Sequence, residues 1–347
     1  MLILRCLVVC ILLTVYLGAC SKEKDQTSPS NRVPVSGSAL GSWGFIDRTG
    51  KMAIEARYQN AEAFNEGLAR VETAEGYIFI DRAGRAVLEV KGECGRHFDD
   101  GLLPFLEDHQ WGYMDRQGRT VIAPQYEDVM PFCRERAFVK QHDRWGVIDK
   151  SGKEILEPIC ERASQFTADG LARVKIKKID SGYIDREGKI FGSYSAHEPF
   201  SEGLAAVKKG KWGFIDRQNK MVIARRFDHA GEFHEGRGAV AIDKHWGFVD
   251  RQGKLVVPTI YFNVMPFSEG RAAVVTDRGL FGFIDPDGNE VIKPTFHDAA
   301  EFSGGLAPVM RNEIWGYIDR NGKYAIEPHF EFAGVFKEDL AAVQVKQ

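Results

Sequence analysis

Aspartate is the residue that this chain places most regularly where chemistry could occur. Nine aspartates stand about 34 residues apart: Asp47, Asp81, Asp115, Asp149, Asp185, Asp216, Asp250, Asp285 and Asp319. Carboxylates bind calcium, but a calcium site needs about six to eight oxygen ligands around one ion. One carboxylate per 34 residues does not supply such a cluster, so we interpret the nine aspartates as turn residues.

Tryptophan has the same spacing. All six copies occupy one recurring position: Trp43, Trp111, Trp145, Trp212, Trp246 and Trp315. Indole rings stack on sugars, so a glycan-binding surface is one interpretation. The same ring in unit after unit is also what packing between repeated units requires. We favour the packing role and keep a cell-wall glycan as the alternative ligand.

No other group of residues has the spacing of a known catalytic or metal site. His229, His234 and His245 are the nearest to a histidine cluster, and they lack zinc-ligand spacing. No nucleophile elbow, phosphate-binding loop or HExxH stretch occurs. A formal net charge of −3 gives no electrostatic argument for nucleic acid. We therefore expect no enzymatic activity, no cofactor, no metal and no nucleic-acid partner.

The elements that carry these residues begin with a recurring strand of the form Trp-Gly-Phe-Ile-Asp. It starts at residues 43, 77, 111, 145, 181, 212, 246, 281 and 315. Alternation places Trp43 and Phe45 on one side of the strand and Ile46 on the other, so we expect both faces to be covered. The glycine (Gly44 in the first copy) fails only at Ile78, and such a glycine usually marks the close approach of another backbone or ring.

A tight turn follows each of these strands. Gly50 stands three residues after Asp47, and a glycine or Asn219 repeats this spacing in every copy. The stretch from Asp285 to Gly288, which has Pro286 second, fits a type I turn. A following residue with positive φ makes a hairpin with a bulge, and the aspartate accepts hydrogen bonds from amides of the turn.

The rest of each unit contains a second strand, a connector and a third strand. Proline often ends the second strand, as at Pro124, and the connector carries a phenylalanine in every copy, such as Phe64. The third strand opens with a Gly-Leu-Ala sequence, as at Gly67. Each unit is thus predicted to be a three-strand antiparallel meander that is too small to be stable without its neighbours.

This pattern of Trp-Gly-(Phe/Tyr)-Ile-Asp-x-x-Gly-Lys, Pro-x-(Tyr/Phe) and Phe-x-Glu-Gly-Leu-Ala-x-Val resembles the bacterial WG-repeat family over about residues 41–347. The resemblance implies a β-rich repeat, often in the cell envelope, and it carries over no catalytic residue. The departures are Ile78 after Tyr77, Ser181 and Phe281 at the tryptophan position, a shortened fifth unit, and Glu135 in place of glycine.

We expect an all-β tandem array of nine repeats forming an open superhelix or solenoid, with a closed propeller-like ring as the alternative. The repeat array begins with a Trp-Gly strand at Trp43 and finishes with a Leu-Ala strand at Leu340 to Val343. These two strands are complementary halves of one hairpin, and their pairing would close a ring and remove the exposed edges.

The N-terminal residues are predicted to lie outside the repeat domain. Arg5, an apolar stretch from Leu7 to Leu17 and the small residues before Cys20 are typical of a secretory signal over residues 1–19. Leu17-Gly18-Ala19-Cys20 resembles a bacterial lipobox, which implies acylation of Cys20. Residues 20–40 have the polar composition of a flexible tether, and residues 41–347 form the repeat domain.

Three cysteines remain in the repeat domain. Cys160 takes a position that is aromatic elsewhere, so we interpret it as a small buried apolar residue. Cys94 and Cys133 are the one pair that we would test for a disulfide. The repeat pattern is least regular over residues 92–99, 134–138 and 193–198, where we would look first for a specialised site.

Together these features favour a lipid-anchored, non-enzymatic protein of the cell envelope that binds a protein partner, with a glycan or peptidoglycan ligand as the alternative and a hydrolase as a third hypothesis. Ser21 after the cysteine favours the outer membrane, where there is one.

The anchor can be tested directly. Cys20→Ala removes the sulfur that would carry the lipid, and without acyl chains the polar tether has little affinity for a bilayer. We expect the variant to move from the membrane fraction to the soluble fraction. Continued membrane association of Cys20→Ala would contradict the anchor.

Overall fold

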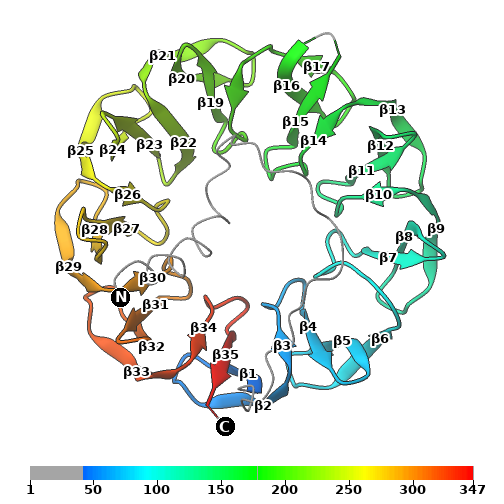
Figure 1. Cartoon of the computed structure of the whole chain (residues 1–347), viewed down its shortest axis with the longest axis horizontal. Helices are drawn as coiled ribbons and strands as arrows, with labels where there is room; N and C mark the ends of the chain where they lie inside the picture. The colour runs from blue at the N-terminus through cyan, green and yellow to red at the C-terminus, as the bar shows by residue number, and fades with distance from the viewer. Residues whose placement is uncertain (1–41, 178, 347) are drawn as a thin grey trace, which may run out of the picture. The chain divides into compact units, whose positions relative to one another are not determined.

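The computed structural model describes residues 42–177 and 179–346, and these residues form β-strands connected by turns. The predicted signal, the tether and Cys20 lie outside the described residues. The strands form nine small antiparallel sheets, which follow one another around a ring in Figure 1. We call each sheet a blade. Blade 1 has the strand order β34-β35-β1-β2, blade 2 is β3–β6, blade 3 is β7–β9, and blades 4 to 9 follow in chain order.

The inner strands have two residues each except the six-residue β22, and the strands that follow are longer except the two-residue β17. The innermost strands are β34 (Phe332–Ala333), β3 (Asn60–Ala61), β10 (Asp128–Val129), β14 (Arg162–Ala163), β18 (Ala196–His197), β22 (His229–His234), β26 (Asn263–Val264) and β30 (Asp298–Ala299). The second strands are β35 (Ala341–Val345), β4 (Leu68–Thr73), β7 (Leu103–Glu107), β11 (Arg136–Gln141), β15 (Leu171–Ile176), β19 (Leu204–Lys209), β23 (Arg237–Ile242), β27 (Ala272–Val275) and β31 (Ala307–Arg311).

The Trp-Gly sequence lies in the third strand of each blade, and the fourth strand forms the outer rim (Figure 1). The third strands are β1 (Ser42–Ile46), β5 (Gly76–Asp81), β8 (Gln110–Met114), β12 (Arg144–Asp149), β16 (Ile179–Asp185), β20 (Lys211–Asp216), β24 (His245–Val249), β28 (Phe281–Ile284) and β32 (Ile314–Ile318). The outer strands are β2 (Met52–Tyr58), β6 (Ala86–Val90), β9 (Thr120–Tyr126), β13 (Glu154–Cys160), β17 (Ile190–Phe191), β21 (Met221–Phe227), β25 (Leu255–Tyr261), β29 (Glu290–Phe296) and β33 (Tyr324–Phe330).

The two ends of the repeat array pair with each other. Strand β1 lies antiparallel to β35, with Ser42 opposite Val345 and Phe45 opposite Ala342. The array is therefore a closed nine-bladed β-propeller. The predicted open superhelix is wrong and the alternative ring is confirmed, because pairing the complementary end strands satisfies backbone groups that an open array would leave exposed at an edge.

The boundaries of the blades differ from those of the predicted meander. Each blade takes its inner and second strands from one repeat and its third and outer strands from the next. The short inner strand comes from the connector, which we had not predicted to be a strand. In blade 3 this strand is reduced to the bridge between Cys94 and Phe105, and the amide of Gly95 donates to the carbonyl of Pro104 at 2.8 Å.

The turn between the third and outer strands has the predicted hydrogen bonds. The amide of Gly50 donates to the Asp47 carbonyl at 3.0 Å, and the Asp47 amide donates to the Lys51 carbonyl at 2.9 Å. One carboxylate oxygen of Asp47 accepts from the amide of Thr49 at 2.8 Å and from that of Lys51 at 3.2 Å. Gly50 has a φ of 86°, and Asn219, at the same place in blade 6, has a φ of 63°.

The Trp-Gly glycine is required because the outer strand passes directly over it. Between the pairs Trp43–Tyr58 and Phe45–Ile54, the single residue Gly44 of β1 faces three residues of β2. A Cβ added at Gly44 would lie 2.6 Å from the carbonyl oxygen of Ile54. Such a contact would force the two strands apart.

Blade 2 has Ile78 at this position and has no such irregularity. Tyr77, Ile78 and Phe79 pair in unbroken register with Val90, Glu89 and Leu88. The outer strand therefore does not cross over residue 78 as it crosses over Gly44. The one exception to the glycine pattern thus coincides with a different course of the outer strand.

Aromatic pairs hold adjacent blades together. Phe45 of blade 1 packs edge-to-face on Phe64 of blade 2, with ring centres 4.9 Å apart, and both side chains are buried. Equivalent pairs join the next blades: Phe79–Phe98, Tyr113–Phe132, Tyr183–Phe200, Phe214–Phe233, Phe248–Phe267, Phe283–Phe302 and Tyr317–Phe336.

Blade 4 keeps this contact because its aromatic ring comes from the second strand instead of the third strand. Val147 stands where the other copies have an aromatic ring, and its partner across the strands is Phe138. The Phe138 ring takes over the contact and stacks on Phe166, with ring centres 5.1 Å apart.

The three cysteines of the described residues are free, so Cys94 and Cys133 are not joined. Cys160 is fully buried among apolar residues, as predicted.

The turn assignment predicts a difference between two substitutions. Gly118→Val places a β-branched residue at a φ of 74°, and its Cβ would lie 3.0 Å from Leu88 Cδ1. We expect a loss of about 1–3 kcal/mol in the free energy of unfolding. Asn219→Gly relieves a positive φ but removes the oxygen that accepts from the Tyr194 hydroxyl, so we expect a change close to zero. Urea unfolding measures both, and equal effects would contradict the assignment.

Candidate functional site

Five of the six indole rings are seen to pack between blades. Trp212 and Trp315 are buried, at 6% and 7% exposure, and the other four are half-buried. Most of them pack in one apolar cluster with a small residue of the next blade's inner strand: Trp43 with Ala61, Trp111 with Val129, Trp145 with Ala163, Trp212 with Ala230, and Trp315 with Ala333. Much of each ring is therefore engaged within the propeller.

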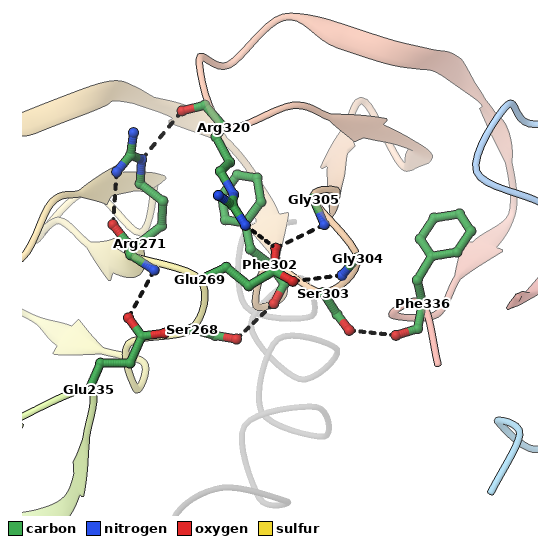
Figure 2. Close-up of polar contacts among 11 residues, drawn as sticks. Glu235, Ser268, Glu269, Arg271, Phe302, Ser303, Gly304, Gly305, Arg320 and Phe336 are labelled. Atoms are coloured by element: carbon green, nitrogen blue, oxygen red, sulfur yellow. Dashed lines mark hydrogen bonds and ion pairs between the residues drawn. The ribbon is translucent and has the colours of Figure 1, made fainter. Parts of the chain in front are cut away.

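A second set of contacts between blades is polar, and it is drawn in Figure 2. The carboxylate of Glu269 accepts from the amides of Gly304 and Gly305, each at 2.8 Å, and lies 3.0 Å from the guanidinium of Arg320. Partial burial pushes the pKa of Glu269 up, but Arg320 and the two amides together hold it below its ordinary value. Ser268 adds a hydrogen bond to the carbonyl of Phe302 at 2.8 Å.

We call this set of contacts the carboxylate belt, because an acid of one blade caps a turn of the next blade at most junctions. The acid–amide pairs are Glu338–Gly67, Glu66–Gly101, Asp100–Glu135, Asp169–Gly203, Glu202–Gly236, Glu235–Gly270 and Glu269–Gly305. The series is interrupted where Arg134 and Gly304 stand at the acid position. Sequence analysis missed the belt, although an acid followed by glycine in most repeats was a visible signal.

The junction between blades 5 and 6 departs most from the repeat pattern. Ser181 stands at the tryptophan position, and His197 stands where the other inner strands have a small residue. The imidazole Nε2 donates to the Gly182 carbonyl at 2.9 Å and the ring packs edge-to-face on Tyr183 with centres 4.8 Å apart. At this junction the small side chain, Ser181, is therefore on the third strand and the large one, His197, is on the inner strand, which is the reverse of the other junctions.

Two titratable groups at this junction have altered pKa values. Burial raises the pKa of Glu198 to about 7, despite the guanidinium of Arg173 at 3.5 Å from its carboxylate. Burial also lowers the pKa of His197 to about 4. Arg173 donates to the His197 carbonyl at 3.1 Å, and the Tyr183 hydroxyl donates to the Glu198 carbonyl at 2.6 Å. A buried carboxyl that titrates near neutral pH is a marker of functional sites, though also of structural ion pairs.

The other irregular stretches have different consequences. Residues 92–99 provide the reduced inner strand of blade 3, and residues 134–138 interrupt the belt and supply Phe138. A shallow depression of about 190 Å³ lies at blades 3 and 4, lined in part by Tyr126, Gly146 and Pro158. This volume is below the roughly 300–1,000 Å³ of most small-molecule sites, and Glu198 is not in its lining.

Within residues 42–177 and 179–346, no three histidine, cysteine or acidic side chains are grouped so that they could hold a metal ion. In the same part of the chain we find no helix with the length and apolar character needed to cross a membrane.

The closed ring of nine blades, eight of them four-stranded, and the repeated contacts between blades define a tandem-repeat β-propeller. The chain belongs to the family described as "WG containing repeat", whose model matches residues 43–77, 111–145, 145–178, 182–211, 212–244, 246–278, 281–313 and 315–347. The unmatched stretch between the first two of these ranges contains Ile78 and the irregular residues of blades 2 and 3.

Solved structures support the fold alone. A structure titled as that of the eukaryotic initiation factor matches with a TM-score of 0.57 at 11% identity, covering 88% of this chain and 98% of that chain. The computationally designed Ika8 protein matches with a TM-score of 0.45 at 11% identity, covering 82% and 95%. The comparison with curated proteins found no match.

The titration of Glu198 predicts a pH-dependent effect of Glu198→Gln. Because the folded-state pKa of about 7 lies above the ordinary value of 4.5, the carboxyl's contribution to stability is complete below pH 4.5 and is lost as the pH rises through 7. Glutamine mimics the protonated acid at every pH. We expect the variant to match wild type near pH 4.5 and to exceed it at pH 8 by about 1–3 kcal/mol in the free energy of unfolding.

The measurement is denaturant unfolding of both proteins across this pH range. Glu62→Gln is the matched control, because Glu62 lies 3.4 Å from Arg70 at the equivalent place in blade 2. A difference between Glu198→Gln and wild type that did not vary with pH would show that Glu198 is not protonated by burial.

Proposed function

We propose that this protein is a lipid-anchored scaffold of the cell envelope that uses the surface of its propeller to bind a protein partner and carries out no catalysis. The cysteine at position 20 and its preceding lipobox-like residues support the anchor. The polar segment after Cys20 would let the propeller reach a partner away from the membrane.

One observation carries the proposal for a protein partner. Ile260 and Phe262, on either side of Tyr261 where the chain passes from blade 7 to blade 8, are each 60% exposed. These are the highest exposures among the large apolar side chains of the described residues. Ile260 and Phe262 are two positions apart and form a small exposed apolar patch, and exposed apolar patches mark surfaces that another protein covers.

A cell-wall glycan is the second candidate ligand. Trp43, Trp111, Trp145 and Trp246 are only half-buried, so part of each indole is accessible. Stacking of a sugar on an indole would change its fluorescence. Tryptophan emission that is unchanged across a series of cell-wall fragments would exclude this candidate.

The protein-partner proposal is tested by crosslinking in envelope membranes that contain the full chain. We expect wild type to form a specific crosslinked species. We expect the double variant Ile260→Ser and Phe262→Ser to lose most of it, because serine removes the apolar area that the partner would cover.

The matched control is the double variant Val87→Ser and Val222→Ser, which replaces two apolar side chains that are 48% and 42% exposed on other blades. It should crosslink like wild type, and thermal unfolding should show that all three proteins are folded. No specific species for wild type, or equal loss in both double variants, would count against the proposal.

A further inference from the structure

We propose that the exposed edge of the junction between blades 5 and 6 binds an acidic segment of a partner protein through Arg162, Lys175, Lys177 and Lys209, which we together call the cationic notch. This inference rests on the proposed function, since it names a surface and the chemistry of the partner. All four side chains are exposed.

The packing of the two blades shows that two of these side chains face the same junction. Leu171 of β15 packs in one apolar cluster with Ala205 and Val207 of β19, so these residues point toward each other across the junction. Side chains alternate along a strand. Lys175 lies between Val174 and Ile176, which both pack in the apolar cluster on the side of blade 4, so Lys175 faces blade 6. Lys209 follows Ala205 and Val207 at alternate positions of β19 and faces blade 5.

The remaining two cations extend this row. Arg162 of the inner strand β14 is the register partner of Lys175, and paired residues of neighbouring strands lie on the same side of the sheet. Lys177 lies in the turn directly after β15. Strands β15 and β19 belong to neighbouring blades of the ring, as Figure 1 shows.

The same junction lacks the ring that closes the others. An indole, or the ring of Tyr77 or Phe281, stands at this position of the third strand in the other eight blades, whereas blade 5 has Ser181. In blade 4 the second-strand residue directly opposite this ring is Lys140, opposite Trp145. In blade 5 the residue at the ring position is Ser181, so the neighbouring second-strand cation has a hydroxyl group beside it instead of an indole.

Few carboxylates of the described residues offset this charge. Glu161 lies 4.0 Å from Lys175 and also 3.3 Å from Arg144. Lys211, the register partner of Lys209, is already ion-paired with Asp228, so we leave it out of the notch. A net positive patch on a chain with a formal charge of −3 favours an acidic partner, because complementary charge speeds encounter and rejects partners of the same charge.

Acidic residues elsewhere on the same face of the propeller favour a short acidic segment, and not an anionic membrane, as the partner of the notch. The turns between second and third strands of all blades lie at one face, and those of blades 2 and 3 carry exposed Glu75, Glu107 and Asp108. A flat anionic surface that touched the notch would also approach these acids and be repelled by them. A segment that binds only across blades 5 and 6 avoids this repulsion.

The test uses the full chain in a non-ionic detergent and a fluorescein-labelled peptide of alternating Glu and Gly, with the Gln-for-Glu peptide as the control probe. We expect wild type to bind the acidic peptide with an affinity that falls as salt rises. The triple variant Lys175→Gln, Lys177→Gln and Lys209→Gln should bind it about tenfold more weakly or worse, by fluorescence anisotropy.

The matched control is the triple variant Lys51→Gln, Lys254→Gln and Lys323→Gln, which removes the same charge from three exposed lysines in turns of other blades. It should bind the peptide like wild type. Equal weakening in both triple variants would assign the binding to overall charge, and undiminished binding by the notch variant would overturn the proposal. Thermal unfolding checks that both triple variants fold.

A vesicle arm separates the membrane from the acidic segment. The full chain with Cys20→Ala is sedimented with phosphatidylglycerol or phosphatidylcholine vesicles. We expect no notch-dependent binding to either, and notch-dependent binding to the anionic vesicles without binding to the peptide would overturn the proposal. Failure of the proposed function is seen separately, as the absence of a crosslinked partner for wild type, whatever the peptide assay gives.

Discussion

The propeller depends on the contact between the aromatic ring of each third strand and the phenylalanine in the following blade's inner loop. A blade of short strands has apolar side chains on both faces, so both faces are shielded from water only when a blade packs on each side. The ring centres in these pairs lie 4.7–5.1 Å apart. Such pairs contribute about 0.5–1.5 kcal/mol each beyond the area they bury. Where Val147 interrupts the series, Phe138 restores the contact from the opposite strand.

Neighbouring blades are tied together at three levels along their strands. Indoles packed on small inner-strand residues lie toward one face, the aromatic pairs lie in the middle, and the carboxylate belt lies toward the other face. The ring closes through the same devices, since Glu338 caps the turn at Gly67 while Asp339 pairs with both Arg48 and Arg82. Packing and polar contacts therefore both continue across the junction where the two ends of the repeat array meet.

The sequence predicted the local structure better than the arrangement of the blades. The aspartate–glycine turn, the loop phenylalanines and buried Cys160 follow from residue types at fixed spacing, because each depends on contacts that recur in every unit. Closure depended on the accumulated angle between nine blades, which no single repeat records. The inner strand was missed because two-residue strands such as Asn60–Ala61 leave no alternation to detect.

At the candidate site, sequence analysis located the irregular stretch that contains His197 and Glu198 but not its chemistry. Burial alters both pKa values at a junction where the contacts of His197 and Glu198 with Arg173 and Tyr183 come from another blade. The exchange of Ser181 with His197 becomes visible only when the third strand of blade 5 is placed beside the inner strand of blade 6. A residue that departs from the repeat pattern is therefore best interpreted together with the departing residue that it faces in the neighbouring blade.

The way in which each blade combines two repeats has a consequence for how such a chain can change. A chain with one more or one fewer whole unit would still begin with the same half-sheet and finish with its complement. Duplication or loss of a unit therefore leaves no unmatched strand, and only the wedge angle between sheets has to adapt. By the same reasoning, a circularly permuted chain that is opened between the second and third strands of another blade should also begin with a third strand and finish with a second strand. The architecture thus allows the number of repeats to vary over evolutionary time while the ring still closes by pairing of its first and last strands.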